Sequence, residues 1–455
     1  MTHFTSVNPY NGETLDTHAL MTNAEINAAL QLAENAFAHW RKETIANRLQ
    51  VIANVAEQLL ANKTSLALLI TNEMGKLYTE AIAEVEKCAS VCRYYASHAE
   101  AFLQPESISA NYVASFIQYE PIGAVLGIMP WNFPFWQVFR YAVPTLAAGN
   151  VTLLKHAPNV CGCAKAIAHI WLAAGAPEGV FQSLITEVDT VHTLLQAPIV
   201  QAVTFTGSNK AGSIVAGIAG QQVKKSVLEL GGSDAMMVLP DANMQQAAAV
   251  ALQARLLNAG QSCIGPKRII VVSEGYDAFM QALLQLLPAY TLGNPLLPET
   301  RIAPLARVDL AQQLHQQLQQ SIQLGAQLSY GTTDFDGCNV APVLLTQVQP
   351  HMPAFAEETF GPLIAVTTAA NEQAALALAN QSKYGLAASI WTNDRAKATA
   401  LANQLAAGAV FINAMVKSDP RLPFGGIKQS GYGRELYKQG LLEFVNIKTI
   451  VSELG

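Results

Sequence analysis

Residues 203–212 read Val-Thr-Phe-Thr-Gly-Ser-Asn-Lys-Ala-Gly, a short apolar run followed by a glycine turn and the start of a helical pattern. Similar apolar runs recur along the chain, each separated from the next by an alanine-rich stretch of helix length. This alternation is typical of strands that are buried on both faces of a parallel sheet and joined by crossover helices. The sequence therefore predicts an α/β fold.

The apolar runs fall into two series. The first occupies residues 124–128, 151–154, 203–205 and 226–228, and the second occupies residues 235–239, 269–272, 363–366 and 410–413. A chain of 455 residues is also too long for one ordinary core. We expect two doubly wound α/β domains with a boundary near Gly231 and Gly232.

Two regions lie outside these series. The first hundred residues have helical patterns, and Thr22-Asn23-Ala24-Glu25 has the form of a capping box at a helix start. Residues 112–119 and 444–451 instead alternate between apolar and polar side chains, as strands do.

The composition argues against several classes of function. A formal net charge of −6, with scattered basic residues, gives no reason to expect nucleic acid binding. The chain shows no signal-peptide pattern, no apolar stretch of membrane-spanning length and no disulfide framework among its six cysteines. We therefore expect a protein of the reducing cytoplasm that binds no membrane, and the cysteine spacing predicts no metal site.

Three residues supply the parts for covalent chemistry on a carbonyl. Cys263 ends the run Asn-Ala-Gly-Gln-Ser-Cys and offers a thiol nucleophile. Glu229 begins a Glu-Leu-Gly-Gly segment and could act as a general base, while the side-chain amide of Asn132, in Pro-Trp-Asn-Phe-Pro, could stabilise an oxyanion. An isolated cysteine is usually a structural thiol, so the interpretation depends on all three.

The order and setting of these motifs resemble the NAD(P)-dependent aldehyde dehydrogenase superfamily, most closely the succinate semialdehyde dehydrogenases. The resemblance runs from about Asn8 to Lys448 and includes Pro-Phe-Gly-Gly-Ile-Lys-Gln-Ser-Gly-Tyr-Gly-Arg-Glu at 423–435. It implies that Cys263 adds to an aldehyde, that Asn132 stabilises the oxyanion of the thiohemiacetal, and that hydride loss leaves a thioester. Water activated by Glu229 would then release the carboxylic acid.

The resemblance also implies a division of the chain. Residues 1–102 and 121–230 would form a Rossmann-like cofactor-binding domain, residues 231–424 the catalytic domain, and residues 425–441 would return to the cofactor domain. Residues 103–120 and 442–455 would form a small β element that joins the subunits of a homodimer or homotetramer. The alternative for this element is two surface strands that cap one sheet.

The resemblance further implies a cofactor site. Gly207, Ser208 and Gly212 lie in a Gly-Ser-x-x-x-Gly turn at a predicted helix N-terminus, which offers free N–H groups to a pyrophosphate. By itself this turn is a weak signal. Other cofactor contacts are expected at Trp131, Lys155, Leu230, Glu358 and Phe360.

The choice between NADP and NAD depends on Lys155 and Pro158. Many NAD-preferring relatives carry a glutamate at the position of Pro158, where it binds the ribose hydroxyls. Without that carboxylate a 2′-phosphate meets no repulsion, and Lys155 is available to pair with it. We expect NADP to be accepted and NAD to be the other cofactor.

The substrate residues are expected on the helix after Pro134. Gln137 and Arg140 are three residues apart and therefore share one face of that helix. The resemblance implies that Arg140 and Ser418 bind a substrate carboxylate, for which a guanidinium is well shaped. A salt bridge at the subunit surface is the alternative for Arg140.

The substrate match is incomplete at one position. The same relatives often carry a second arginine at the place of Leu257, and Lys417 or Gln137 are the candidates to compensate. An aromatic-lined tunnel is expected from Phe135, Trp136 and Phe424. Succinate semialdehyde is the predicted substrate, and broad use of aliphatic or aromatic aldehydes is the alternative.

Other classes of function fit the sequence less well. The sequence has no histidine within twenty residues of Cys263, which argues against a non-redox cysteine hydrolase. Such a function would also leave the cofactor motifs unexplained. A catalytically silent relative would be expected to have lost Cys263 or Glu229. An acylating, CoA-dependent dehydrogenase often lacks the base, so Glu229 favours hydrolysis to the free acid.

Overall fold

The chain begins with a hairpin and four helices in the computed structural model, which describes residues 2–454. β1 (His3–Val7) and β2 (Thr14–Ala19) pair antiparallel, and the helices are α1 (Asn23–Trp40), α2 (Ile45–Ala61), α3 (Lys63–Met74) and α4 (Tyr78–Phe102). The predicted capping box is confirmed, because the Thr22 hydroxyl accepts from the Glu25 N–H and the Glu25 carboxylate accepts from the Thr22 N–H. Only helices were expected over the first hundred residues, and this expectation was wrong where β1 and β2 form the hairpin.

The first series of apolar runs supplies four strands, β5, β6, β8 and β9, of a six-stranded sheet in the order β17-β9-β8-β5-β6-β7. Its strands are parallel except for the edge strand β17, which pairs antiparallel with β9. The strands are β5 (Ala124–Met129), β6 (Val151–His156), β7 (Phe181–Ser183), β8 (Val200–Thr206), β9 (Lys225–Glu229) and β17 (Gly431–Tyr432). The helices between them are α5 (Trp136–Ala147), α6 (Cys161–Ala173), α7 (Thr190–Gln196) and α8 (Asn209–Gln221).

The second series supplies four strands, β10, β11, β14 and β16, of a seven-stranded sheet in the order β12-β13-β14-β11-β10-β15-β16. This sheet is again parallel except at the edge strand β12. The strands are β10 (Asp234–Val238), β11 (Pro266–Val272), β12 (Gln327–Tyr330), β13 (Val343–Thr346), β14 (Leu363–Ala369), β15 (Ala387–Trp391) and β16 (Ala409–Ile412). Its helices are α9 (Met244–Leu256), α10 (Tyr276–Leu286), α11 (Val308–Gln323), α12 (Pro353–Ala356), α13 (Glu372–Asn380) and α14 (Arg395–Ala402). The predicted α/β class with two parallel-sheet domains is confirmed.

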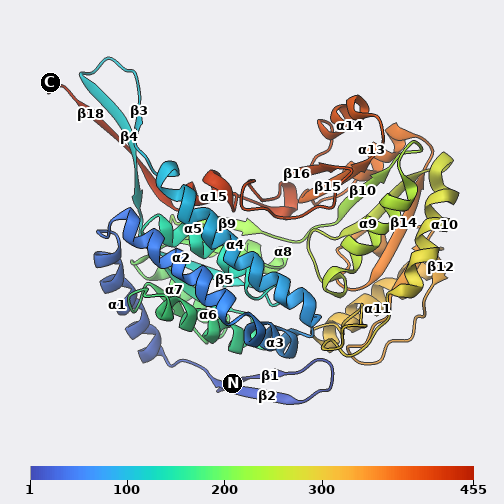
Figure 1. The fold of residues 1–455 in the computed structure, drawn as a ribbon, viewed down its shortest axis with the longest axis horizontal. Helices are drawn as coiled ribbons and strands as arrows, with labels where there is room; N and C mark the ends of the chain where they lie inside the picture. Colours follow the sequence, from blue (N-terminus) through green and yellow to red (C-terminus); the bar gives the residue numbers. More distant parts are fainter. Residues whose placement is uncertain (1, 455) are drawn as a thin grey trace.

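A third, three-stranded sheet extends away from the body of the molecule (Figure 1). It contains β3 (Glu106–Ser107), β4 (Ala114–Pro121) and β18 (Val445–Ser452), and β18 follows the short helix α15 (Tyr437–Leu442). The last strand pairs antiparallel with β4 along its whole length, from Val445 opposite Pro121 to Ser452 opposite Ala114. The predicted domain limits are compatible with these three sheets but stay a prediction.

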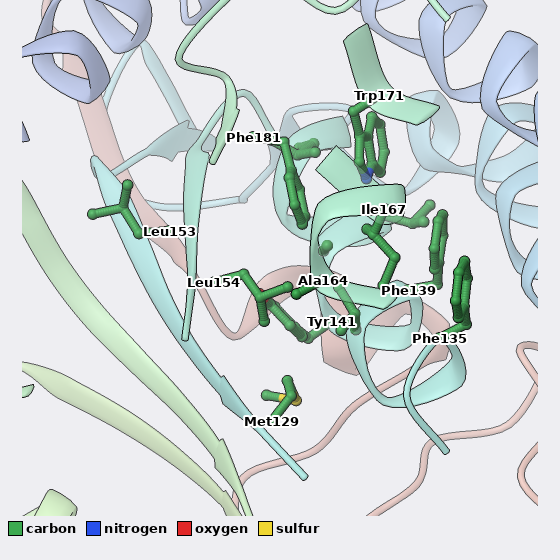
Figure 2. Close-up of a cluster of buried hydrophobic side chains, with 14 of the residues drawn as sticks. Met129, Phe135, Phe139, Tyr141, Leu153, Leu154, Ala164, Ile167, Trp171 and Phe181 are labelled. Carbon is green, nitrogen blue, oxygen red and sulfur yellow. The ribbon is translucent and has the colours of Figure 1, made fainter. Parts of the chain in front are cut away.

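A stack of aromatic side chains fixes α5 against α6 (Figure 2). The rings of Phe135, Phe139, Trp171 and Phe181 follow one another with centroids 6.3, 6.1 and 5.8 Å apart, and neighbouring rings lie within 14° of parallel. All four side chains are buried. Because this face of α5 is held in the core, its other side is free to present Gln137 and Arg140 to a cavity.

Candidate active site

Cys263 lies in an irregular loop between α9 and β11, and this loop has a strained backbone. Asn258 and Ala259 both have positive φ, at 55° and 52°, which L-residues adopt at a cost. The Asn258 amide stabilises the turn by donating to the carbonyls of Asn132 and Gln261, at 2.8 and 3.2 Å. Gly260 approaches residue 361 so closely that a Cβ would lie 2.1 Å from its carbonyl oxygen.

Two buried cations hold the ends of this loop. Arg255 Nη1 donates to the Gly260 carbonyl at 3.0 Å, and Lys267 Nζ donates to the carbonyls of Ser262 and Cys263 at 2.6 and 2.5 Å. Both side chains are fully buried. The nucleophile is therefore fixed by its backbone, and Cys263 lines two cavities.

The thiol of Cys263 is predominantly protonated at neutral pH. Burial raises its pKa to about 11, although the positive charges of Lys267 and Arg140 act in the opposite direction. A thiolate is the reactive form of cysteine. An adjacent base or a bound ligand must therefore help to remove the proton.

Asn132 contacts the same loop from the turn after β5. Its side-chain Nδ2 donates to the Gln261 carbonyl at 3.0 Å, while its Oδ1 has no hydrogen-bond partner among the described residues. An amide nitrogen carries two hydrogens, so one remains to donate to a second acceptor. This arrangement suits a donor to an oxyanion formed at Cys263.

Glu229 ends β9 and lies in a buried cluster of charges. Both of its carboxylate oxygens lack a hydrogen-bond partner among the described residues. Burial and the negative charge of Glu435 raise its pKa well above the ordinary range, while Arg140 and Arg434 oppose this shift. A carboxylate with a raised pKa is a stronger base than an exposed one, which suits proton removal from water or a thiol.

Two cavities meet at Cys263. The first, here called the α4–α5 cavity, has a volume of about 200 Å³. That is smaller than the roughly 300–1,000 Å³ of sites for drug-sized ligands, so it suits a short molecule. Its lining includes Lys87, Phe133, Trp136, Gln137, Arg140, Leu257, Cys263, Lys417, Ser418 and Phe424.

Gln137, Arg140, Ser418 and Phe424, the four predicted substrate residues, all line the α4–α5 cavity. The expectation for Phe135 was wrong. Its ring points into the aromatic stack (Figure 2), whereas Phe133 lines the cavity. Pro134 precedes the first turn of α5, and the sequence could not show which face of that turn is buried.

The second space, the β8–β9 cavity, is lined by most of the predicted cofactor residues. Its lining includes Trp131, Asn132, Thr206, Gly207, Ser208, Glu229, Leu230, Cys263, Arg307, Glu358 and Phe360. Two predicted cofactor residues, Gly212 and Lys155, are not in this lining. Gly212 lies in α8, where a Cβ would meet Leu230 at 2.4 Å, and Lys155 is buried at the end of β6.

The β8–β9 cavity fits a nicotinamide dinucleotide. Ser208 caps α8 by accepting from the Ala211 N–H, and Gly207 and Ser208 line the cavity. The N-terminus of α8, which offers free N–H groups to a phosphate, therefore adjoins this space. The rings of Trp131 and Phe360 meet edge to face across the cavity wall, with centroids 6.2 Å apart. Glu358 accepts from the Gly232 N–H at 2.9 Å and lies 3.5 Å from Lys267 Nζ.

Comparison with known proteins agrees with this geometry. The model of the aldehyde dehydrogenase family matches residues 1–450. The chain belongs to the aldehyde dehydrogenase family. It is 43% identical to a succinate semialdehyde dehydrogenase (NAD(P)+) of Escherichia coli, over 99% of this chain and 98% of the relative. It is also 47% identical to a Synechocystis sp. protein named probable succinate-semialdehyde dehydrogenase (NADP+), over 98% of each chain.

A solved relative has the same fold. The crystal structure of succinic semialdehyde dehydrogenase from Streptococcus pyogenes, in complex with NADP+, superposes with a TM-score of 0.96 at 35% identity, covering 98% of this chain and 99% of that chain. The predicted resemblance to this enzyme family is confirmed. Within residues 2–454, no helix of this aldehyde dehydrogenase is long and apolar enough to cross a membrane.

Sequence reasoning missed three charged residues of the site. Lys87 of α4 lines the α4–α5 cavity, Lys267 holds the nucleophile loop, and Glu435 forms a buried ion pair with Arg140. Glu435 ends the 423–435 motif, which was a usable signal. Neither lysine stands in a motif, so only their three-dimensional contacts reveal them.

Proposed function

We propose that this aldehyde dehydrogenase oxidises succinate semialdehyde to succinate with NADP or NAD. One observation carries the choice of substrate: the short cavity that ends at Cys263 also contains Arg140 and Ser418. A guanidinium and a hydroxyl are donors suited to a carboxylate. A neutral aldehyde of the same length would offer these two side chains no carboxylate and would therefore gain no charge-assisted hydrogen bond from them.

The chemistry begins with proton removal from Cys263. The thiolate sulfur forms a bond to the aldehyde carbon, and the carbonyl oxygen becomes an oxyanion that accepts from Asn132 Nδ2. The oxyanion then re-forms a carbonyl as the aldehyde carbon loses its hydrogen as a hydride, which a nicotinamide held by the residues of the β8–β9 cavity would accept. The product on the protein is a thioester of Cys263.

Hydrolysis of the thioester depends on Glu229. Its carboxylate takes a proton from a water molecule, and the oxygen of that water adds to the thioester carbon. The carbon–sulfur bond breaks, the acid leaves, and Cys263 is returned as a thiolate. The raised pKa of Glu229 makes its carboxylate a suitable base for both proton removals.

The cofactor choice rests on β6 and the following turn. Lys155 is buried at the carboxyl end of β6, and Pro158 leaves this turn without a carboxylate. The relatives named above use NADP+ or NAD(P)+ according to their names, which supports acceptance of NADP by this chain.

The decisive assay is steady-state reduction of NADP and of NAD with succinate semialdehyde and with butanal, its four-carbon neutral counterpart. We expect kcat/KM to be at least tenfold higher for succinate semialdehyde. Equal values for both aldehydes would contradict the substrate assignment and favour a broad-specificity enzyme.

We further propose that the β3–β4–β18 sheet joins subunits of a homodimer or homotetramer. The sheet extends from the body (Figure 1) and exposes Ile447 and Val451 of β18, while the loop before β4 exposes Tyr112 and Val113. These four side chains are 49–59% exposed. An apolar sheet of this kind usually needs a covering partner. Sedimentation equilibrium should give a dimer or tetramer mass, and a monomer mass would overturn the proposal.

A further inference from the structure

Lys87 brings a positive charge to the α4–α5 cavity. Its ammonium donates to the Ser418 hydroxyl at 2.7 Å and lies 4.1 Å from the centre of the Trp136 ring. An ammonium has three hydrogens, and the Ser418 bond uses one of them. The Lys87 side chain is half-buried and lines the same cavity as Cys263.

The acidic groups nearest to Lys87 are already paired with other cations. Glu84 forms a buried ion pair with Lys76, and Asp419 pairs with Arg421. Across residues 2–454, no carboxylate forms an ion pair with Lys87 itself. The Lys87 ammonium is therefore a cation without a counterion beside a half-open cavity, which is an unfavourable state that an anion would relieve.

Arg140 differs from Lys87 in this respect. Its guanidinium forms an ion pair with Glu435 and donates through Nη2 to the Thr206 hydroxyl at 3.1 Å. Much of its charge is thus neutralised inside the protein. Arg140 can offer a hydrogen bond to a ligand, whereas Lys87 offers a positive charge that no carboxylate of the described residues balances.

We propose that Lys87, together with Ser418, binds the carboxylate of the aldehyde substrate and so determines specificity for an ω-carboxy aldehyde. The inference rests on the proposed function and deepens it. Lys87 and Ser418 come from α4 and from the segment after β16, and their contact spans 331 residues of sequence. The carboxylate would join these two segments across the mouth of the cavity.

Titration of Lys87 gives the proposal a second, independent consequence. Burial and the charge of Arg140 lower the pKa of Lys87 to about 8, against the raising effects of Cys88, Glu84 and Asp419. Glu80, on the same cavity wall, has a pKa raised to about 7 by burial. As the pH rises from 8 to 10, Lys87 loses its charge. The KM for a carboxylate substrate should therefore rise by up to tenfold for each pH unit.

The test compares succinate semialdehyde with butanal in wild type, Lys87→Met, Lys87→Arg and the control Lys63→Met, since Lys63 forms an exposed ion pair with Glu86 and does not line the α4–α5 cavity. We expect Lys87→Met to lower the ratio of kcat/KM for the two aldehydes by about 10- to 100-fold, as the loss of a charge-assisted hydrogen bond does. Most of the loss should lie in KM for succinate semialdehyde. Lys87→Arg should keep most of the ratio of kcat/KM for the two aldehydes. Because a guanidinium stays charged above pH 8, the rise of KM with pH should be smaller in this variant.

Each contrary outcome has a distinct meaning. A wild type without preference for succinate semialdehyde overturns the proposed function, and the Lys87 proposal with it. A wild-type preference that Lys87→Met leaves intact overturns the Lys87 proposal alone. An equal loss for both aldehydes in Lys87→Met indicates a purely structural contact with Ser418 and overturns the Lys87 proposal. A fall in the ratio in Lys63→Met as large as that in Lys87→Met indicates general attraction by surface charge and overturns it as well.

Discussion

Arg140 forms an ion pair with Glu435 inside the protein, and the two side chains are only 2% and 3% exposed. Glu435 also lies close enough to Glu229 to raise the pKa of that carboxyl group. A residue expected to bind substrate and the expected general base are therefore linked through one buried carboxylate. A change at Glu435 should therefore affect both the stability of the site and the pH dependence of the reaction.

Replacing Arg140 with alanine should destabilise the protein. The Glu435 carboxylate would remain buried without its cation, which typically costs about 3–5 kcal/mol. The double variant Arg140→Met/Glu435→Gln removes both charges and should recover much of this loss. Thermal unfolding of the three proteins checks the prediction, which fails if Arg140→Ala unfolds at the wild-type temperature.

Replacing Glu435 with glutamine should shift the pH dependence of kcat toward lower pH. Glu229 acts as a base only when deprotonated, so the rate of thioester hydrolysis rises as pH passes through its raised pKa. Removing the negative charge of Glu435 also leaves the Arg140 cation uncompensated, and both changes lower the pKa of Glu229. Stopped-flow turnover from pH 6 to 10 measures the shift.

A matched control for this profile is Glu372→Gln. Glu372 belongs to a half-exposed ion pair with Lys397, on α13 and α14. Its removal should leave the profile of kcat against pH unchanged. If Glu435→Gln has the same profile as this control, Glu435 does not act on the base.

Gly231→Ala should weaken cofactor binding. A Cβ at this position would lie 2.4 Å from Glu358 Oε2 and 2.9 Å from Asn209 Oδ1, so the Glu358 carboxylate would have to move away from the β8–β9 cavity. We expect KM for NADP to rise at least tenfold. Gly217→Ala on α8 is the control, because a Cβ there meets nothing within 4 Å and alanine favours the helix by roughly 0.5–1 kcal/mol. Similar KM values in the two variants would contradict the assigned role of Glu358.

The sequence was informative where function depends on local patterns. The apolar runs predicted β5, β6, β8 and β9 of one large sheet and β10, β11, β14 and β16 of the other, because strands buried on both faces are continuously apolar. The remaining strands, β7, β12, β13, β15 and β17, were not predicted. The same runs are informative about the site, because Glu229 directly follows the run 226–228 and Cys263 precedes the run 269–272. The β1–β2 hairpin was missed because His3–Val7 and Thr14–Ala19 are short and mostly polar.

Contacts between distant segments could not be predicted. Lys87 lies within the 25-residue helix α4, and its partner Ser418 lies 331 residues later in the sequence. The pairing of Arg140 with Glu435 likewise joins α5 to the segment after β17. Periodicity gives the face of a helix but not the neighbour against which that face packs.

The most direct measurement is to capture the thioester in Glu229→Gln. With its base removed, this variant should form the bond to Cys263 more slowly than the wild type does, because the thiol must ionise without Glu229, and it should hydrolyse the thioester more slowly still. After brief reaction with NADP and succinate semialdehyde, peptide mass spectrometry should find a succinyl group on Cys263, with about one NADPH formed per active site. A variant that carries no acyl group, or carries it on another residue, would contradict the account.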